Sequence, residues 1–310
     1  MPEPRISVGL PQYLPDESPA VLAPFAARAE ELGFAGLWTV DSVPGSATSR
    51  VQSIEGLHAL TAASAVTDAI GLGVSVIVLP DRNPARLARE LATIDVLSGG
   101  RLTVGIGLGR ADPLGASLGF PADRRVRRLE EGLRIMRALW SGDDVSFDGE
   151  LFRFAGVTVG PKPARRPGPP VWFGAGAPQA LRRAARLGDG WMGAGSSSSA
   201  AFAEQVGILR DALHERDRDP GAFPIAKRVY LAVEDTEARA LERMTPRLDG
   251  FYDAPGMTER VAICGPPETC AARLRELVDA GAGELLLNPL YDYLRQLDAF
   301  AEVAALVRAA

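Results

Sequence analysis

Short runs of apolar residues alternate with longer amphipathic stretches along most of the chain. The run at 71–79 (GLGVSVIVL) is apolar on both faces, a pattern that favours a parallel strand covered by helices on both sides. The runs predicted as strands span residues 5–10, 35–40, 71–79, 101–108, 171–175, 190–194, 225–233 and 284–288.

The stretches between these runs carry apolar residues at helical spacing and recognisable helix ends. In the stretch 18–33, for example, Ser18 is a suitable N-cap, Pro19 occupies the first turn and Gly33 ends the helix. The predicted helices span 18–33, 54–67, 84–98, 123–140, 178–187, 200–216, 236–247, 267–280 and 291–308. Eight strands alternating with helices in 310 residues predict an α/β fold, a single (β/α)8 TIM barrel over residues 1–310.

Two segments interrupt this alternation. Residues 145–159 alternate around Asp148-Gly149 and predict a β-hairpin, while 160–170 is rich in proline and arginine. We expect 141–170 to be an insertion over the carboxyl-end mouth of the barrel. Residues 248–260 are expected to form a second, irregular insertion at the same face.

Charge and cysteine content narrow the classes of function. The net charge of −5 and the lack of a basic run argue against nucleic-acid binding. The apolar runs are shorter than the ~18 residues that a membrane span needs, and the N-terminal residues lack the apolar core of a signal peptide. We therefore expect a cytoplasmic protein without membrane contact. Two cysteines and two distant histidines do not predict a metal site, and the thiols are expected to be reduced.

Barrel enzymes of this type carry their active site at the carboxyl ends of the strands, so the residues that follow each strand are the candidates. These positions are rich in glycine and poor in histidine, which leaves little for a Ser-His-Asp hydrolase. Scarce acid–base groups fit chemistry carried by an organic cofactor.

One candidate is the stretch Gly174-Ala175-Gly176-Ala177, which follows a strand and precedes a helix at Pro178. Small residues let backbone N–H groups approach a phosphate, and the helix N-terminus favours the anion. The alternative is an ordinary tight turn. Asp41 is a second candidate because it closes an apolar strand, where its carboxylate either faces the pocket or caps a loop.

Six segments together resemble the luciferase-like flavin- and deazaflavin-dependent oxidoreductases over nearly the whole chain. They are GFAGLWTVDS (33–42), IEGLHALTAASAVTDAIGLGVSVIVLP (54–80), NPARLARELATIDVLSGGRLTVGIGLG (83–109), RRLEEGLRIMRALWSGDDVSFDGELF (127–152), PKPARRPGPPVWFGAGAPQALRRAARLGDGW (161–191) and GPPETCAARLRELVDAGAGELLLNP (265–289). The resemblance implies a barrel that holds FMN or the deazaflavin F420 at its mouth.

The same resemblance assigns positions around the cofactor. It implies a non-prolyl cis peptide at Ser75–Val76 against the central ring, a phosphate on Gly174–Ala177, and Asp41 near the ring. Further cofactor contacts are expected at the strand ends, namely Leu10, Gly107, Gly109 and Arg110. Arg110 is alternatively a site for an anionic substrate or the cofactor tail.

The motif style is closer to the F420-dependent branch, with FMN as the alternative. Sugar-phosphate dehydrogenases of that branch place a histidine after the aspartate and a glutamate after the glycine that ends strand four. This chain has Ser42 and Arg110 there, which argues against a sugar phosphate. The proton donor is then Asp112, Ser42 or a water on Asp41.

The leading prediction is an F420-dependent oxidoreductase that transfers a hydride between the deazaflavin and a small organic substrate. The alternatives are an FMN-dependent monooxygenase fed by a separate reductase, and a non-catalytic protein that binds flavin or F420. The resemblance also implies a homodimer, with the helices at 54–67 and 84–98 as its interface.

Overall fold

The computed structural model describes residues 3–13, 18–41, 53–109, 116–120 and 122–309. Within these ranges, eight parallel strands close into a barrel, because β9 pairs with both β8 and β11. In barrel order the strands are β1 (Arg5–Gly9), β2 (Gly36–Thr39), β3 (Gly71–Val78), β4 (Leu102–Gly107), β7 (Val171–Gly174), β8 (Gly190–Gly193), β9 (Ile225–Val233) and β11 (Glu284–Asn288). The predicted (β/α)8 barrel is confirmed.

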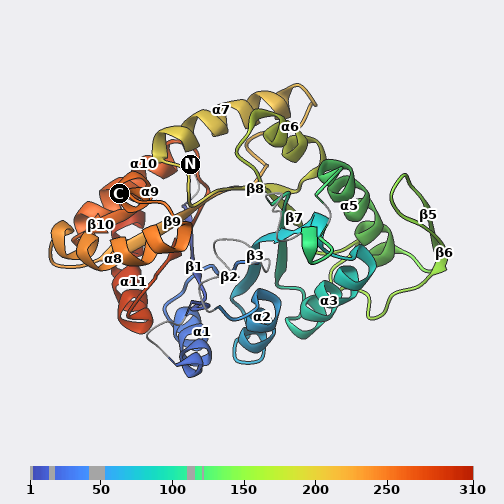
Figure 1. Ribbon diagram of the computed structural model, residues 1–310. Helices are drawn as coiled ribbons and strands as arrows, with labels where there is room; N and C mark the ends of the chain where they lie inside the picture. Colours follow the sequence, from blue (N-terminus) through green and yellow to red (C-terminus); the bar gives the residue numbers. More distant parts are fainter. Residues whose placement is uncertain (1–2, 14–17, 42–52, 110–115, 121, 310) are drawn as a thin grey trace.

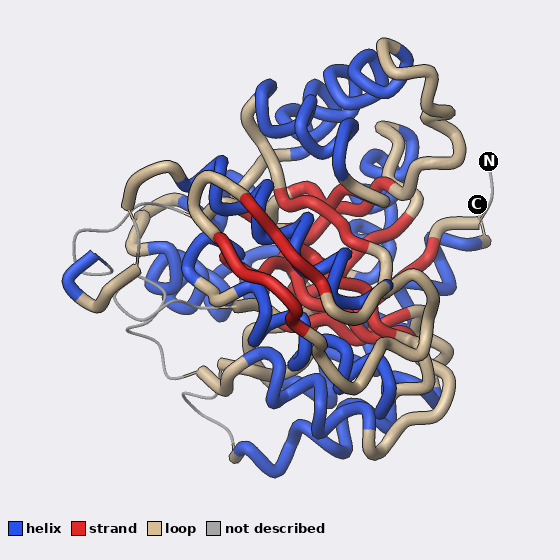
Figure 2. Tube along the Cα trace, turned by 90° about the vertical axis from the view of Figure 1, so that its right-hand side faces the viewer, coloured by secondary structure: helices blue, strands red, loops and turns tan. Residues whose placement is uncertain are grey.

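Helices follow the strands and form an outer ring, which Figures 1 and 2 show around the sheet. They are η1 (Pro19–Val21), α1 (Leu22–Glu31), α2 (Gly56–Ser64), η3 (Leu79–Asp81), α3 (Pro84–Leu97), α5 (Arg125–Ser141), α6 (Pro178–Leu187), α7 (Ser199–His214), α8 (Glu237–Tyr252), α9 (Met257–Val261), α10 (Pro267–Asp279) and α11 (Tyr293–Arg308). The strands predicted at 225–233 and 284–288 and the helix predicted at 178–187 match the structure to the residue.

The barrel interior is filled by side chains. Residues on the outer face of the strands pack against the helices, whereas the inward residues Trp38, Trp172, Met192, Ala226 and Leu286 form a separate apolar cluster. The rings of Trp38 and Trp172 lie 5.4 Å apart. A Cβ at Gly73 would lie 2.3 Å from the Trp38 ring, so only glycine leaves room for the indole there. The interior is therefore a packed core, and a ligand has to bind at one of the two ends.

The hairpin predicted in 141–170 is present as β5 (Val145–Asp148) and β6 (Arg153–Val157), which pair antiparallel. Its placement over the mouth is wrong. Figure 1 shows the hairpin outside the ring of helices beside α5, where the Glu131 carboxylate accepts hydrogen bonds from the N–H groups of residues 150–152. The following segment runs past the amino end of the barrel, where Arg165 donates to the carbonyl of Leu102 at 3.0 Å. Because β7 starts at that end, the connection from α5 has to pass there.

The expectation of irregular structure at 248–260 is also wrong. Helix α8 continues through Pro246 to Tyr252, since Leu248 and Phe251 extend its buried stripe. After a short break, Asp249 accepts hydrogen bonds from the N–H groups of Gly256 at 2.7 Å and Thr258 at 2.8 Å, which fixes the start of α9. Strand β10 (Ile263–Gly265), which the sequence analysis missed, then pairs parallel with the end of β9.

Candidate cofactor and active site

Two side-chain clamps tie neighbouring strand ends together at the carboxyl rim. After β1, the buried amide of Gln12 accepts from the N–H of Val40 at 2.6 Å and donates to the Val40 carbonyl at 2.9 Å. After β3, the Asp81 carboxylate receives both Nη atoms of Arg125, at 2.7 and 3.0 Å. Arg125 also donates to the carbonyl of Leu108 beyond β4. These contacts fix the end of β1 relative to β2, and the end of β3 relative to β4.

Asp41 follows β2, and its side chain is only 3% exposed. One carboxylate oxygen accepts from Arg82 Nη2 at 2.6 Å, and the other accepts from the Val78 N–H at 3.1 Å. Asp41 thus joins the ends of β2 and β3 through a buried ion pair, in agreement with the capping alternative. Its contact with a cofactor stays a prediction.

The peptide bond Ser75–Val76 is cis, as the family resemblance implies. Here β3 shifts its register against β4, and the Val76 side chain lies among glycines of two other strands, β4 and β7. A Cβ at Gly105, Gly107 or Gly174 would lie 3.1, 2.7 and 2.8 Å from a methyl carbon of that side chain. Only glycine fits at these positions. The rim of β3, β4 and β7 therefore presents backbone and one small side chain, which suits a planar ring.

Beside this surface, a cavity of about 240 Å³ lies between the end of β4 and the start of α6. Gly107, Gly109 and Gly174–Ala177 line it together with apolar side chains. Ala177 is the N-cap of α6 and has no side-chain cap bond. Within the described part of the chain, the N–H groups of Gly176, Ala177 and Gln179 donate no hydrogen bond. Unpaired N–H groups at a helix N-terminus form an anion site.

Arg183, which the sequence analysis did not single out, supplies a guanidinium to this cavity. Its side chain is 14% exposed, and its Nε lies 3.3 Å from Glu130. Glu130 also contacts Arg186 at 2.6 Å. Arg183 is thus a cation among the otherwise small or apolar residues that line this cavity.

The opposite side of the mouth is lined by residues that the sequence analysis missed. Arg228 of β9 lies inside the barrel and reaches the carbonyl of Ser75 at 3.4 Å. The hydroxyl groups of Tyr230 and Tyr252 lie 2.8 Å apart, and burial raises the pKa of Tyr252 well above its usual range. The signal was Arg228 and Tyr230 at alternate positions of the strand, which places both on the same face.

The sequence matches the family described as luciferase-like monooxygenase over residues 5–284. The chain belongs to this family. One relative is the F420-dependent glucose-6-phosphate dehydrogenase of Kineococcus radiotolerans, which is 30% identical to this luciferase-like chain. The alignment covers 94% of this chain and 94% of the relative. The chain is therefore an oxidoreductase of this family.

Solved structures share the fold of this luciferase-like protein. An F420-dependent secondary alcohol dehydrogenase in complex with an F420-acetone adduct superposes with a TM-score of 0.85 at 20% identity, over 99% of each chain. The oxygenating constituent of 3,6-diketocamphane monooxygenase from Pseudomonas putida, in complex with FMN, gives 0.78 at 17% identity, over 99% of this chain and 98% of that one. At these identities the likeness shows the architecture and not the reaction.

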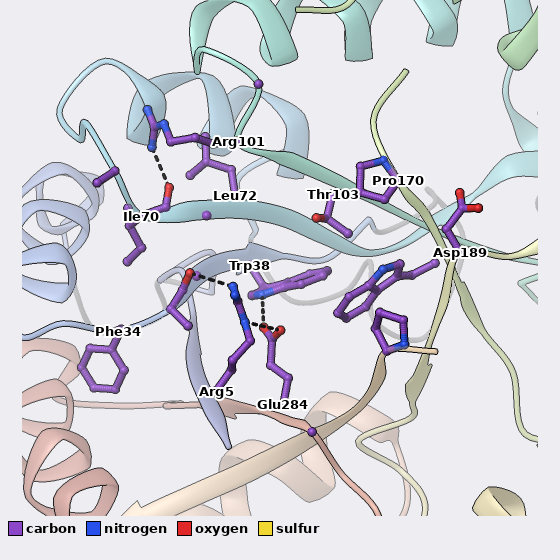
Figure 3. Close-up of a pocket in the computed structure, with 18 of the residues that line it drawn as sticks. Arg5, Phe34, Trp38, Ile70, Leu72, Arg101, Thr103, Pro170, Asp189 and Glu284 are labelled. Carbon is purple, nitrogen blue, oxygen red and sulfur yellow. Dashed lines mark hydrogen bonds and ion pairs between the residues drawn. The ribbon is translucent and has the colours of Figure 1, made fainter. Parts of the chain in front are cut away.

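A larger cavity, of about 910 Å³, lies at the amino end of this luciferase-like barrel (Figure 3). Charged groups that line it are engaged by other groups of the protein. Glu284 contacts Arg5 at 3.3 Å and accepts from the Trp38 indole at 3.2 Å, while Arg101 donates to the carbonyl of Ile70 at 2.7 Å. Barrel chemistry takes place at the other end, so we assign these contacts to stability.

Some of the remaining predicted site residues are described by the structure, and others are not. Gly107 and Gly109 line the small cavity, whereas Leu10 is buried and donates its N–H to the Trp38 carbonyl at 2.8 Å. Ser42, Arg110 and Asp112 lie outside the described residues. Their predicted roles stay predictions.

The structure also bears on membrane spans, metal sites and the two cysteines. Among the described residues, no helix is long and apolar enough to cross a membrane, and no three His, Cys, Asp or Glu side chains gather as metal ligands. Cys264 and Cys270 are buried free thiols, and burial raises the pKa of each to about 12. These two thiols are therefore protonated and unreactive at neutral pH.

Proposed function

We propose that this chain is an F420-dependent oxidoreductase that transfers a hydride between the deazaflavin and a small organic substrate. The observation that carries the proposal is the anion site at the start of α6, directly beside the glycine-lined surface around Val76. The relative from Kineococcus radiotolerans, which bears an F420-dependent name, supports the choice of deazaflavin.

The residues present fit such a cofactor. Gly176, Ala177 and Gln179 would hold its phosphate with backbone N–H groups, and Arg183 would add positive charge. The rim of β3, β4 and β7 would support the ring, because Gly107 and Gly174 leave no side chain above it. When bound, the deazaflavin supplies the hydride chemistry. The chain itself positions the ring, limits the access of water and provides the proton route.

The proton route we propose runs through Ser42, Asp112 or a water held by Asp41. Both carboxylate oxygens of Asp41 already accept hydrogen bonds, from Arg82 and from the N–H of Val78. A carboxylate engaged in this way can hold and orient a donor at the rim.

The substrate we propose is an alkene, an imine or an alcohol, and not a sugar phosphate. This chain carries Ser42 and Arg110 where the resemblance to sugar-phosphate dehydrogenases requires histidine and glutamate. We expect no reduction of F420 with glucose 6-phosphate. Turnover with that sugar would overturn the substrate proposal while leaving the cofactor proposal intact.

Titration of the purified protein with F420 and with FMN, each oxidised and reduced, tests the cofactor proposal by fluorescence. We expect micromolar affinity for F420 and weak binding of FMN. Gly176→Glu places a negative charge in the anion site and should lower the affinity for F420 at least about tenfold. The matched control is Gly207→Glu, at an exposed glycine of α7. Equal affinities of the two variants would refute the assignment of the phosphate site.

The second candidate is an FMN-dependent monooxygenase supplied by a separate flavin reductase, as the family description and the FMN complex of the Pseudomonas putida relative suggest. A preference for reduced FMN together with oxygen consumption would establish it. A stable complex with either cofactor, but without turnover of any acceptor or donor, would favour a non-catalytic binding protein.

We further propose a homodimer formed through α2 and α3. Three large apolar residues near the ends of these helices are unusually exposed, namely Val66 at 42%, Val96 at 43% and Leu97 at 57%. Apolar side chains that gather on one face of a soluble domain mark a contact surface. The mass of the protein in solution tests this assembly.

A further inference from the structure

Arg228 is a cation inside the barrel mouth for which the proposed mechanism has no use. It lies on β9 in register with Leu286, one of the residues that fill the barrel interior, and so points inward. Its Cζ lies 5.3 Å from the centre of the Tyr230 ring, and Nη1 makes one long hydrogen bond to the Ser75 carbonyl at 3.4 Å. Nε is buried without a hydrogen-bond partner.

This guanidinium forms no ion pair with any carboxylate of the described residues, unlike Arg82 and Arg125 on the same rim. The groups facing it are the phenols of Tyr13, Tyr230 and Tyr252. Burial, and secondly the charge of the neighbouring Arg228, lower the pKa of Lys227 to about 7. A desolvated cation without a counterion costs stability, so its retention indicates a ligand that completes it.

We propose that Arg228 binds a planar oxyanion at the mouth, next to the Ser75 carbonyl. The guanidinium fork matches a carboxylate or the carbonyl edge of an anionic ring, and Arg228 has donors to spare for two parallel hydrogen bonds. The inference rests on the proposed function in that the anion belongs either to the substrate, as a carboxylate, or to the ring of the reduced cofactor. It assigns Arg228 as a binding residue for this anion.

Three proteins test the proposal: the wild type, Arg228→Met, which removes the charge, and Arg228→Lys, which keeps the charge without the fork. Arg153→Met is the matched control, because Arg153 is 78% exposed on the hairpin and its loss changes the net charge equally. Benzoate is titrated by calorimetry as a probe carboxylate. F420 and F420H2 are titrated by fluorescence and absorbance.

We expect Arg228→Met to weaken the binding of benzoate or of F420H2 at least about tenfold, Arg228→Lys to weaken it less, and Arg153→Met to leave it unchanged. A loss confined to benzoate assigns the anion to the substrate, and a loss confined to F420H2 assigns it to the reduced ring. Arg228→Met should melt at the wild-type temperature or above, since it removes an unpaired buried charge.

Affinities within about twofold of the wild type for both probes would overturn the proposal. So would a lowered melting temperature of both Arg228 variants with unchanged affinities in Arg228→Lys, because that result assigns the side chain to the fold. If the wild type binds neither F420 nor F420H2, the proposed function fails, and the benzoate titration still decides whether Arg228 binds an oxyanion.

Discussion

The Asp81–Arg125 pair is the contact at the mouth whose loss we expect to be most damaging. The two side chains are 6% and 12% exposed, and they share two hydrogen bonds of 2.7 and 3.0 Å. Arg125 adds two hydrogen bonds to the Leu108 carbonyl, at 3.1 and 2.7 Å. Arg125→Met keeps the aliphatic stem and leaves the Asp81 carboxylate buried without its partner.

Removing one member of a buried ion pair typically costs about 3–5 kcal/mol, much of it from the charge left behind. We therefore expect Arg125→Met to lower the free energy of unfolding by about 3 kcal/mol or more in urea titrations. Asp81→Asn in the same chain removes the stranded charge and should recover at least about 1 kcal/mol. Affinity for the cofactor should fall as well, because Arg125 holds the strand end that leads into the small cavity.

The control is Arg86→Met, which breaks the Arg86–Glu90 pair of α3. That pair has a similar distance of 2.8 Å, but Arg86 is 82% exposed. Solvent-exposed pairs of this spacing contribute about 0.3–0.5 kcal/mol. If Arg125→Met costs no more than Arg86→Met, or if the double variant is no more stable than Arg125→Met alone, the clamp does not hold the mouth together and the reasoning fails.

Three further predictions concern other parts of the molecule. Burial alone would raise the pKa of Glu131, but the N–H groups of Leu151, Glu150 and Phe152 outweigh it and lower that pKa. The stabilisation from Glu131 is therefore present above the ordinary glutamate pKa and is lost as the pH falls through the lowered value. The difference in melting temperature between wild type and Glu131→Gln should therefore shrink on acidification. A constant difference would contradict this. Gly73→Ala should destabilise the fold by about 1–3 kcal/mol, because its Cβ would meet the Trp38 ring. Gly207→Ala in α7 has open space around the new Cβ and should stabilise the fold by about 0.5–1 kcal/mol. Equal chemical-denaturation midpoints of the two variants would count against the packing argument. Leu97→Glu should shift the protein from dimer to monomer in light scattering, while Leu118→Glu, at a comparably exposed leucine that is not part of α2 or α3, should not. A monomeric wild type would remove the dimer proposal.

Sequence reasoning succeeded where a local pattern has one structural outcome. The run at 71–79, apolar on both faces, favoured a covered parallel strand, and the alternation of eight strands with helices predicted the closed barrel. The small residues at Gly174–Ala177 lead into the N-terminus of α6, as expected, while their contact with a phosphate stays a prediction. The cis peptide at Ser75–Val76 came from the family resemblance, because no local pattern signals it.

It failed where the outcome depends on which end of the barrel a segment reaches. The hairpin at 145–157 was recognised, but its position depends on α5 ending at the amino side and on three N–H groups meeting Glu131. The helix predicted at 236–247 continues to Tyr252 in the structure, because Leu248 and Phe251 are buried.

The sequence by itself therefore determined the eightfold alternation, the strands to within a residue or two, and the glycine-rich strand ends that leave room for a cofactor. These features follow from the spacing of apolar residues and from the small size of glycine, which are local properties. Only the tertiary structure decided that Asp41 is joined to Arg82, and that no carboxylate of the described residues pairs with Arg228. Pairing between charges depends on which strand ends meet when the sheet closes: Asp41 then meets Arg82, whereas Arg228 reaches only the Ser75 carbonyl across the barrel.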